Sequence, residues 1–319
     1  MEARKGRVNG LMSGAAAPSV VWSGQLQADF VFEHMRRRVD FYVQRPPQRD
    51  SHRRVVWRCH LLIMHDVLSW LSVATNALPG VDRDHTLPMK TTVRVVSRFN
   101  GPPDSGNGGY AGGLIAAAIG ETVKVRLIRP IPLDCDLVVT GVDDSWEVRC
   151  GNDIVAVASM TVVEAIVPVP VPYVEALGVS MHFAGFTTHA YPKCFVCGPA
   201  RERDDGLRIF PGCVPGTMAV AAPWLPGHTL DDGHGKVRPE FVWAALDCPG
   251  YFASANPAVA LLGELAVHID RLVHVDEPCV VMGWPIEVTG RKHRVGTALL
   301  DEDGERCALA VATWIELQR

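Results

Sequence analysis

The chain has 319 residues, 48% of them hydrophobic, so it is long and apolar enough to bury one or two globular cores. Its formal net charge of −4 excludes the overall basic field of a nucleic-acid-binding protein, and we expect no nucleic-acid partner. Nine scattered cysteines, an odd number, and a basic amino terminus that precedes no apolar segment favour a reducing, cytoplasmic location.

Residues 1–88 are expected to form a basic, poorly structured extension. Arginine clusters such as residues 36–38 break any sustained strand or helix pattern, and only residues 55–77 could make a helix of useful length. The apolar stretch 61–78 is interrupted by His65 and Asp66, so we expect no membrane span. Two interpretations stay open: a basic arm for an acidic partner or membrane surface, and a dispensable solvated tail.

A regular pattern begins at residue 89 and continues to residue 166. A Gly- and Pro-rich loop leads into an apolar helix over residues 106–120, in which Asn107 can cap the first turn. Alternation of apolar and polar residues predicts strands over 91–99, 123–129, 137–142, 145–149 and 154–164.

Residues 167–193 are predicted to be a Pro-rich linker, because proline alternates with valine at its start, and a short helix is expected over 173–182. From residue 194 to 319 the first plan repeats, with a helix over 239–252 that begins at Pro239. The strands of this part are expected over 207–210, 217–224, 261–271, 279–288, 293–301 and 307–317. The repeated order of strand, loop, helix and four strands indicates an internal duplication.

The duplicated order, the Asn107-Gly108-Gly109-Tyr110 helix start and the turn into a final strand at 304–310 resemble the hotdog superfamily, and specifically the double-hotdog type II acyl-CoA thioesterases. This resemblance covers residues 89–319 and implies an α+β fold with two antiparallel sheets, each wrapped around a central helix. It further implies acyl-CoA or another acyl thioester as ligand, no cofactor, and association into a homo-oligomer.

The helix start is our candidate for substrate binding. The free amides of Gly108, Gly109 and Tyr110, next to Asn107, would polarise a thioester carbonyl, because a helix amino terminus carries partial positive charge. A structural alternative stays open, in which the two glycines only permit tight packing of the helix.

The second helix supplies the candidate carboxylates. The resemblance places the acting aspartate on this helix, so Asp247 is our first choice as the catalytic residue and Glu240 our second, with Trp243 on the same face assigned to substrate binding. The alternative is that Asp247 caps local backbone near Pro249.

The chain departs from the family pattern in one respect that matters for choosing between hydrolysis and simple binding. Type II thioesterases are expected to set the aspartate beside a glutamine, and residues 89–317 contain no glutamine. The leading function is hydrolysis of acyl thioesters, and the alternative is a non-catalytic protein that binds acyl-CoA or an acyl carrier. A purely structural or partner-binding role is a third reading.

Cys194, Cys197 and Cys213 have the spacing of three of the four ligands of a zinc ribbon. His189, His228 or His234 could supply a fourth ligand. A single CxxC is a weak signal, however, so reduced thiols in a turn are favoured and no metal is predicted.

Overall fold

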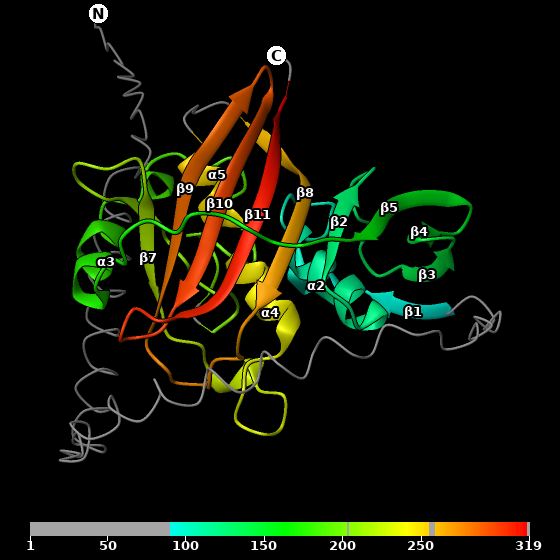
Figure 1. Ribbon diagram of the computed structural model, residues 1–319, viewed down its shortest axis with the longest axis horizontal. Helices are drawn as coiled ribbons and strands as arrows, with labels where there is room; N and C mark the ends of the chain where they lie inside the picture. Colours follow the sequence, from blue (N-terminus) through cyan, green and yellow to red (C-terminus); the bar gives the residue numbers. More distant parts are fainter. Residues whose placement is uncertain (1–89, 203, 255–258, 318–319) are drawn as a thin grey trace, which may run out of the picture.

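The computed structural model describes residues 90–202, 204–254 and 259–317, which form a long antiparallel sheet with helices α2, α4 and α5 behind its strands in the view of Figure 1. The extension 1–88 and the helix expected over 55–77 lie outside the described residues. The strands are β1 (Lys90–Arg94), β2 (Val123–Leu127), β3 (Asp136–Val142), β4 (Ser145–Cys150), β5 (Asp153–Met160), β6 (Gly212–Cys213), β7 (Val220–Trp224), β8 (Ala260–Ile269), β9 (Cys279–Thr289), β10 (Lys292–Leu300) and β11 (Arg306–Glu316).

The helices are α2 (Gly108–Ile119), α3 (Tyr173–Ser180), α4 (Pro239–Ala245) and α5 (Cys248–Ala253), and there are short 3-10 helices η2 (Ser97–Phe99), η3 (Ala184–Phe186) and η4 (His228–Leu230). The expected strand 91–99 is therefore shorter, since its second part turns into η2. The expected strand 207–210 is wrong: these residues hydrogen-bond to the loop at Phe195 and Val196 instead of to a strand.

The order of strands across the sheet repeats. In the first half it is β1-β3-β4-β5-β2, and in the second half the corresponding strands run β7-β9-β10-β11-β8, with β6 added at the outer edge. Each half also sets a helix after its first full strand, α2 in one and α4 with α5 in the other. The internal duplication inferred from the sequence is thus present in the strand order of the sheet.

The expectation of two separate antiparallel sheets needs a correction. The structure has one continuous eleven-stranded sheet, because β2 pairs with β8 where the halves meet. The register sets Val125 opposite Leu265, both buried. Pairing of these strands satisfies backbone groups that two separate sheets would leave at exposed edges. The domain division at 89–166 and 194–319 remains a prediction.

Helices α2 and α4 pack against each other with almost no space between their backbones. A Cβ atom on Gly113 would lie 2.5 Å from Cα of Glu240, and one on Gly109 would lie 2.6 Å from Cβ of Asp247. Distances of this kind leave no room for any side chain at these two positions. The glycines of α2 therefore do permit tight packing, against the helix of the other half.

The second helix is interrupted, whereas the sequence pattern predicts one helix over 239–252. Helix α4 ends at Ala245 and α5 begins at Cys248, with Asp247 between them. Pro249 has no amide hydrogen and its ring crowds the preceding turn, which explains the break. Asp247 consequently lies at a junction instead of in the middle of a helix.

The segment between β5 and α3 crosses the face of the sheet opposite to α2 and α4, as Figure 1 shows. Val171 and Tyr173 at its end are buried in a small cluster with Met282, Trp284 and Leu309 of the sheet. The helix predicted over 173–182 is confirmed as α3. The Pro-rich stretch therefore covers apolar sheet surface.

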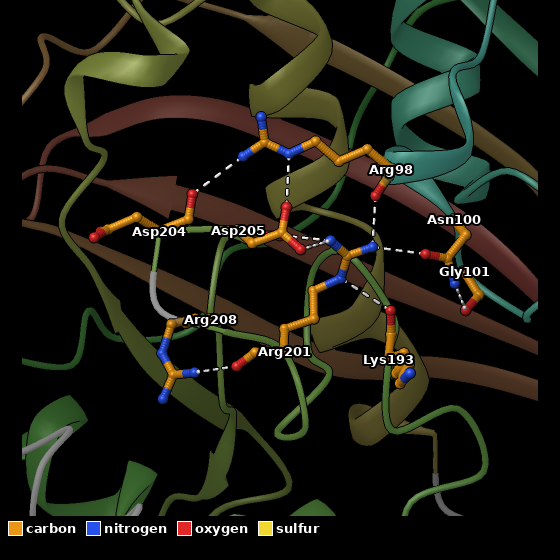
Figure 2. Close-up of polar contacts among 8 residues, drawn as sticks. All are labelled: Arg98, Asn100, Gly101, Lys193, Arg201, Asp204, Asp205 and Arg208. Atoms are coloured by element: carbon orange, nitrogen blue, oxygen red, sulfur yellow. Dashed lines mark hydrogen bonds and ion pairs between the residues drawn. The ribbon is translucent and has the colours of Figure 1, made fainter.

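A buried arginine fastens the loop that follows Cys197 to the loop that precedes α2 (Figure 2). The side chain of Arg201 is 7% exposed and donates to the carbonyl oxygen of Arg98, to Oδ1 of Asn100 and to the carboxylate of Asp205. Arg98 in turn donates to Asp205 at 2.7 Å. The network joins segments about a hundred residues apart in the chain.

Two further findings concern the cysteines and the lengths of the helices. Cys135 and Cys150 form a disulfide at the end of the β3–β4 pair, which differs from what a reducing location would lead us to expect. Among the described residues, no helix is both long and apolar enough to cross a bilayer.

Replacing Gly113 with alanine should lower the free energy of unfolding by about 1–3 kcal/mol, because the new methyl group overlaps the α4 backbone. Urea unfolding followed by circular dichroism measures this change. The matched control is Gly178→Ala on the exposed side of α3, where a Cβ meets nothing within 4 Å, and stability should rise by up to about 1 kcal/mol. Equal effects of the two substitutions would contradict the packing argument.

Replacing Arg201 with methionine should lower the free energy of unfolding by about 1–3 kcal/mol, since the buried guanidinium group loses its hydrogen bonds to the Arg98 carbonyl and to Asn100 Oδ1. Arg306→Met is the control: that guanidinium pairs with Asp270 but is 40% exposed, so its loss should cost less than about 1 kcal/mol. Thermal or urea unfolding of both variants makes the comparison, and a larger loss for Arg306→Met would count against the role given to Arg201.

Candidate active site

The amino terminus of α2 is capped by a side chain, as the sequence predicts. Oδ1 of Asn107 accepts a hydrogen bond from the amide of Tyr110 at 2.9 Å. Asn107 itself is 2% exposed, so its amide group needs partners for both its oxygen and its nitrogen. The nitrogen finds its partner on the other half of the protein, in Asp247.

The carboxylate of Asp247 lies against this helix terminus. Its Oδ2 accepts hydrogen bonds from Nδ2 of Asn107 at 2.8 Å and from the amide of Gly109 at 3.0 Å. Asp247 makes no side-chain cap bond to α5, so the alternative that it caps local backbone is wrong. It binds instead the positive end of the helix from the other half.

Burial dominates the electrostatics of Asp247, which is 2% exposed. Loss of solvent raises its pKa to about 7, although the hydrogen bond from Gly109 opposes the rise. Oδ1 is buried and has no hydrogen-bond partner in the described part of the chain. The carboxyl group therefore retains an unused acceptor in an environment that brings its pKa close to neutrality.

The expected set of free amides is smaller than the sequence suggests. The Gly109 amide is bound by Asp247 and the Tyr110 amide by Asn107. Among the residues that the structure describes, the Gly108 amide has no hydrogen-bond partner. It lies in the first turn of α2, where no earlier helical turn supplies a carbonyl oxygen to accept from it. Gly108 alone of the three is thus available to a ligand.

A cavity of about 490 Å³ opens beside these groups, between the two halves of the sheet. Asn107, Gly108 and Asp247 line it, and Leu127 and Leu262 from β2 and β8 contribute apolar wall. Of the buried side-chain atoms without hydrogen-bond partners in the described chain, three belong to residues lining this cavity: His189 Nε2, Asp247 Oδ1 and Trp314 Nε1. Such a concentration is typical of a site that receives a polar ligand.

The remaining predicted site residues do not line the cavity. Glu240 pairs with Arg238 at 3.4 Å and packs on Gly113, and the Trp243 ring packs on Gly112 between α2 and α4. Tyr110 stacks on Phe99 with ring centroids 4.1 Å apart, and burial raises its pKa to about 12. Tyr110 also contacts Phe241 of α4, with ring centroids 5.5 Å apart, so all three residues pack where the halves meet.

Three cysteines line the same cavity, and they are a different set from the one the sequence indicates. Cys213 lies exposed on β6, whereas Cys248 joins Cys194 and Cys197. Hydrogen bonds from Cys197 and Cys248 hold the pKa of the Cys194 thiol well below its ordinary value. Cys248 directly follows Asp247 in the chain, and this is the one sequence signal that could have pointed to Cys248.

No protein-family model and no curated protein sequence matches the chain. Among solved structures, it is similar to the tesB protein of Mycobacterium avium subspecies paratuberculosis, with 10% identity over 72% of this chain and 93% of that one and a TM-score of 0.48. A hot dog fold protein from Alicyclobacillus acidocaldarius has 10% identity over 76% of this chain and 96% of the other, with a TM-score of 0.43. A Streptococcus mutans protein bound to acetyl CoA has 8% identity over 32% of this chain and 84% of its own, with a TM-score of 0.29.

Proposed function

We propose that the chain hydrolyses acyl thioesters in the cavity at the amino terminus of α2. The observation that carries this proposal is the Asp247 carboxylate, which is buried against that terminus and leaves Oδ1 unpaired in a largely apolar cavity. A carboxylate at this position, with a pKa near neutrality, suits a general base that acts on water.

The chemistry follows from two groups. The Gly108 amide and the positive end of α2 polarise the thioester carbonyl and stabilise the oxyanion as it forms. Asp247 accepts a proton from water while the water oxygen attacks the carbonyl carbon. The tetrahedral intermediate then breaks its carbon–sulfur bond, and the proton held by Asp247 passes to the leaving thiolate, so the products are a carboxylic acid and a free thiol.

The walls of the cavity suit an acyl chain joined to a polar carrier. Leu127, Leu262 and Ile315 supply apolar surface for the chain. Arg129 also lines the cavity and its side chain is 58% exposed, paired with Asp153 at 3.0 Å. A cation there is suited to attract a carrier phosphate such as those of coenzyme A.

A second candidate function is binding of acyl thioesters without cleavage. It is favoured by the single free amide at the helix terminus and by the absence of glutamine from residues 89–317. The two functions share one cavity, and release of free thiol from a panel of acyl-CoAs of different chain length separates them. Measurable binding with no thiol release from any member would establish the second and exclude the first.

Asp247→Asn should lower kcat by about 10²–10⁴-fold, because the amide keeps the size of the carboxyl group but does not take a proton from water. Glu240→Gln should keep kcat near that of the unaltered protein, since Glu240 does not line the cavity. Thiol release measures both, with circular dichroism to verify folding. The opposite ranking would assign the reaction to Glu240.

The role of the Gly108 amide as a hydrogen-bond donor can be tested with two substitutions, of which one removes the amide hydrogen and the other keeps it. Gly108→Pro removes the amide hydrogen at the first helical position, where proline is well accepted after the extended Asn107 backbone. Gly108→Ala adds a similar Cβ, near the flexible end of Leu262, but retains the donor. We expect kcat of the proline variant to be about 10²–10³-fold below that of the alanine variant. Equal kcat values would remove the amide from the mechanism.

A further inference from the structure

Three sulfur atoms meet in the protein interior beside Asp247. Cys194 and Cys197 come from the loop after the linker and Cys248 from the start of α5, and each residue is at most 6% exposed. Their sulfur atoms all lie within 4.8 Å of one another, with Cys194 and Cys248 3.7 Å apart. Two segments that are 54 residues apart in the chain thus bring their sulfur atoms together.

The geometry suits a tetrahedral metal ion. Zinc–sulfur bonds of about 2.3 Å set neighbouring sulfurs of a tetrahedron about 3.8 Å apart, close to the distance between Cys194 and Cys248. The CxxC turn is closed by a hydrogen bond from the Gly198 amide to the Cys194 carbonyl at 2.9 Å, and a Cβ on Gly198 would lie 2.5 Å from that oxygen. Glycine at this position allows the turn that brings the first two sulfurs together.

Neighbouring polar atoms lack partners at this end of the cavity. Oδ1 of Asp247 and Nε2 of His189 are buried and make no hydrogen bond within the described chain. Nδ1 of His189 accepts from the Tyr191 amide at 3.0 Å, which assigns the ring proton to Nε2 and makes that atom a donor. His189 is therefore not arranged as a ligand, and both unpaired atoms call for a bound polar group.

We propose that Cys194, Cys197 and Cys248 bind one Zn²⁺ ion as thiolates, with the fourth coordination position left to a ligand from the cavity. Thiolate sulfur is preferred by Zn²⁺ over the hard cations Mg²⁺ and Ca²⁺, and binding releases the thiol protons to solvent. Sites with three protein ligands keep the fourth position for water or substrate. A water molecule at the fourth position could donate the hydrogen bond that Asp247 Oδ1 lacks within the described chain. The inference does not rest on thioester hydrolysis.

The first test measures metal content in the full chain, purified without chelator and under reducing conditions. Inductively coupled plasma mass spectrometry should find about one zinc per chain, and Cys248→Ser should reduce this to near zero. Cys213→Ser, on exposed β6, and Cys279→Ser, buried elsewhere, are the controls and should keep the zinc. Absence of zinc, its replacement by iron or copper, or equal loss in Cys213→Ser would overturn the proposal.

A second measurement keeps the proposal testable if Cys248→Ser does not fold. Zinc is removed from the unaltered chain with a chelator and Co²⁺ is added, which should produce thiolate-to-cobalt charge-transfer bands and the visible absorption of tetrahedral cobalt. Zinc added afterwards should abolish both. A spectrum without charge-transfer bands, or peptide mapping that finds a Cys194–Cys248 disulfide in the purified chain, would contradict a metal site.

Discussion

The close packing of α2 on α4 is the constraint on which the site depends. Gly109 and Gly113 allow the two helix backbones to approach to a distance that excludes any side chain between them. At this distance the carboxylate of Asp247, just beyond the end of α4, reaches the first turn of α2. A wider separation would leave a buried carboxylate without donors, which costs several kcal/mol.

The balance of interactions at Asp247 explains how a buried carboxyl group is held in place while its pKa stays near neutrality. Hydrogen bonds from Asn107 and Gly109, together with the positive end of α2, offset part of the cost of burying a charge. They do not offset all of it, because Oδ1 has no partner in the described chain and the pKa stays raised to about 7. The incomplete compensation is what a group needs in order to exchange a proton near neutral pH.

The two halves have the same strand order but different helices. In the first half α2 is continuous and begins with small residues, so its terminus can accept a ligand. In the second half Pro249 breaks the helix, and the break carries Asp247 and Cys248 to the cavity. The candidate site is therefore assembled from unlike parts of a duplicated fold: one half supplies donors, and the other supplies a carboxyl group and three cysteines.

Local features of the protein follow from the sequence alone. Alternation of apolar and polar residues predicts most of the strands, and Asn107 is recognisable as a helix cap. Asp247 became a candidate because the family resemblance implies an aspartate on the second helix. Such features depend on residues close together in the chain, whose physical preferences act over a few positions. The repeated order of elements, which needs no long-range contact, also indicated the duplication.

Tertiary structure decided what depends on distant residues. Three features involve segments that only folding brings together. Strand β2 pairs with β8, the Gly109 amide donates to Asp247, and Cys248 rather than Cys213 lies beside Cys194 and Cys197. Strand pairing and the partner of a buried donor are set by global packing, so no local pattern encodes them. The sequence by itself determined most of the helices and strands and offered Asp247 as a candidate, because these depend on residues close together in the chain. The tertiary structure decided which polar atoms near Asp247 remain without a partner, because that depends on how distant segments pack.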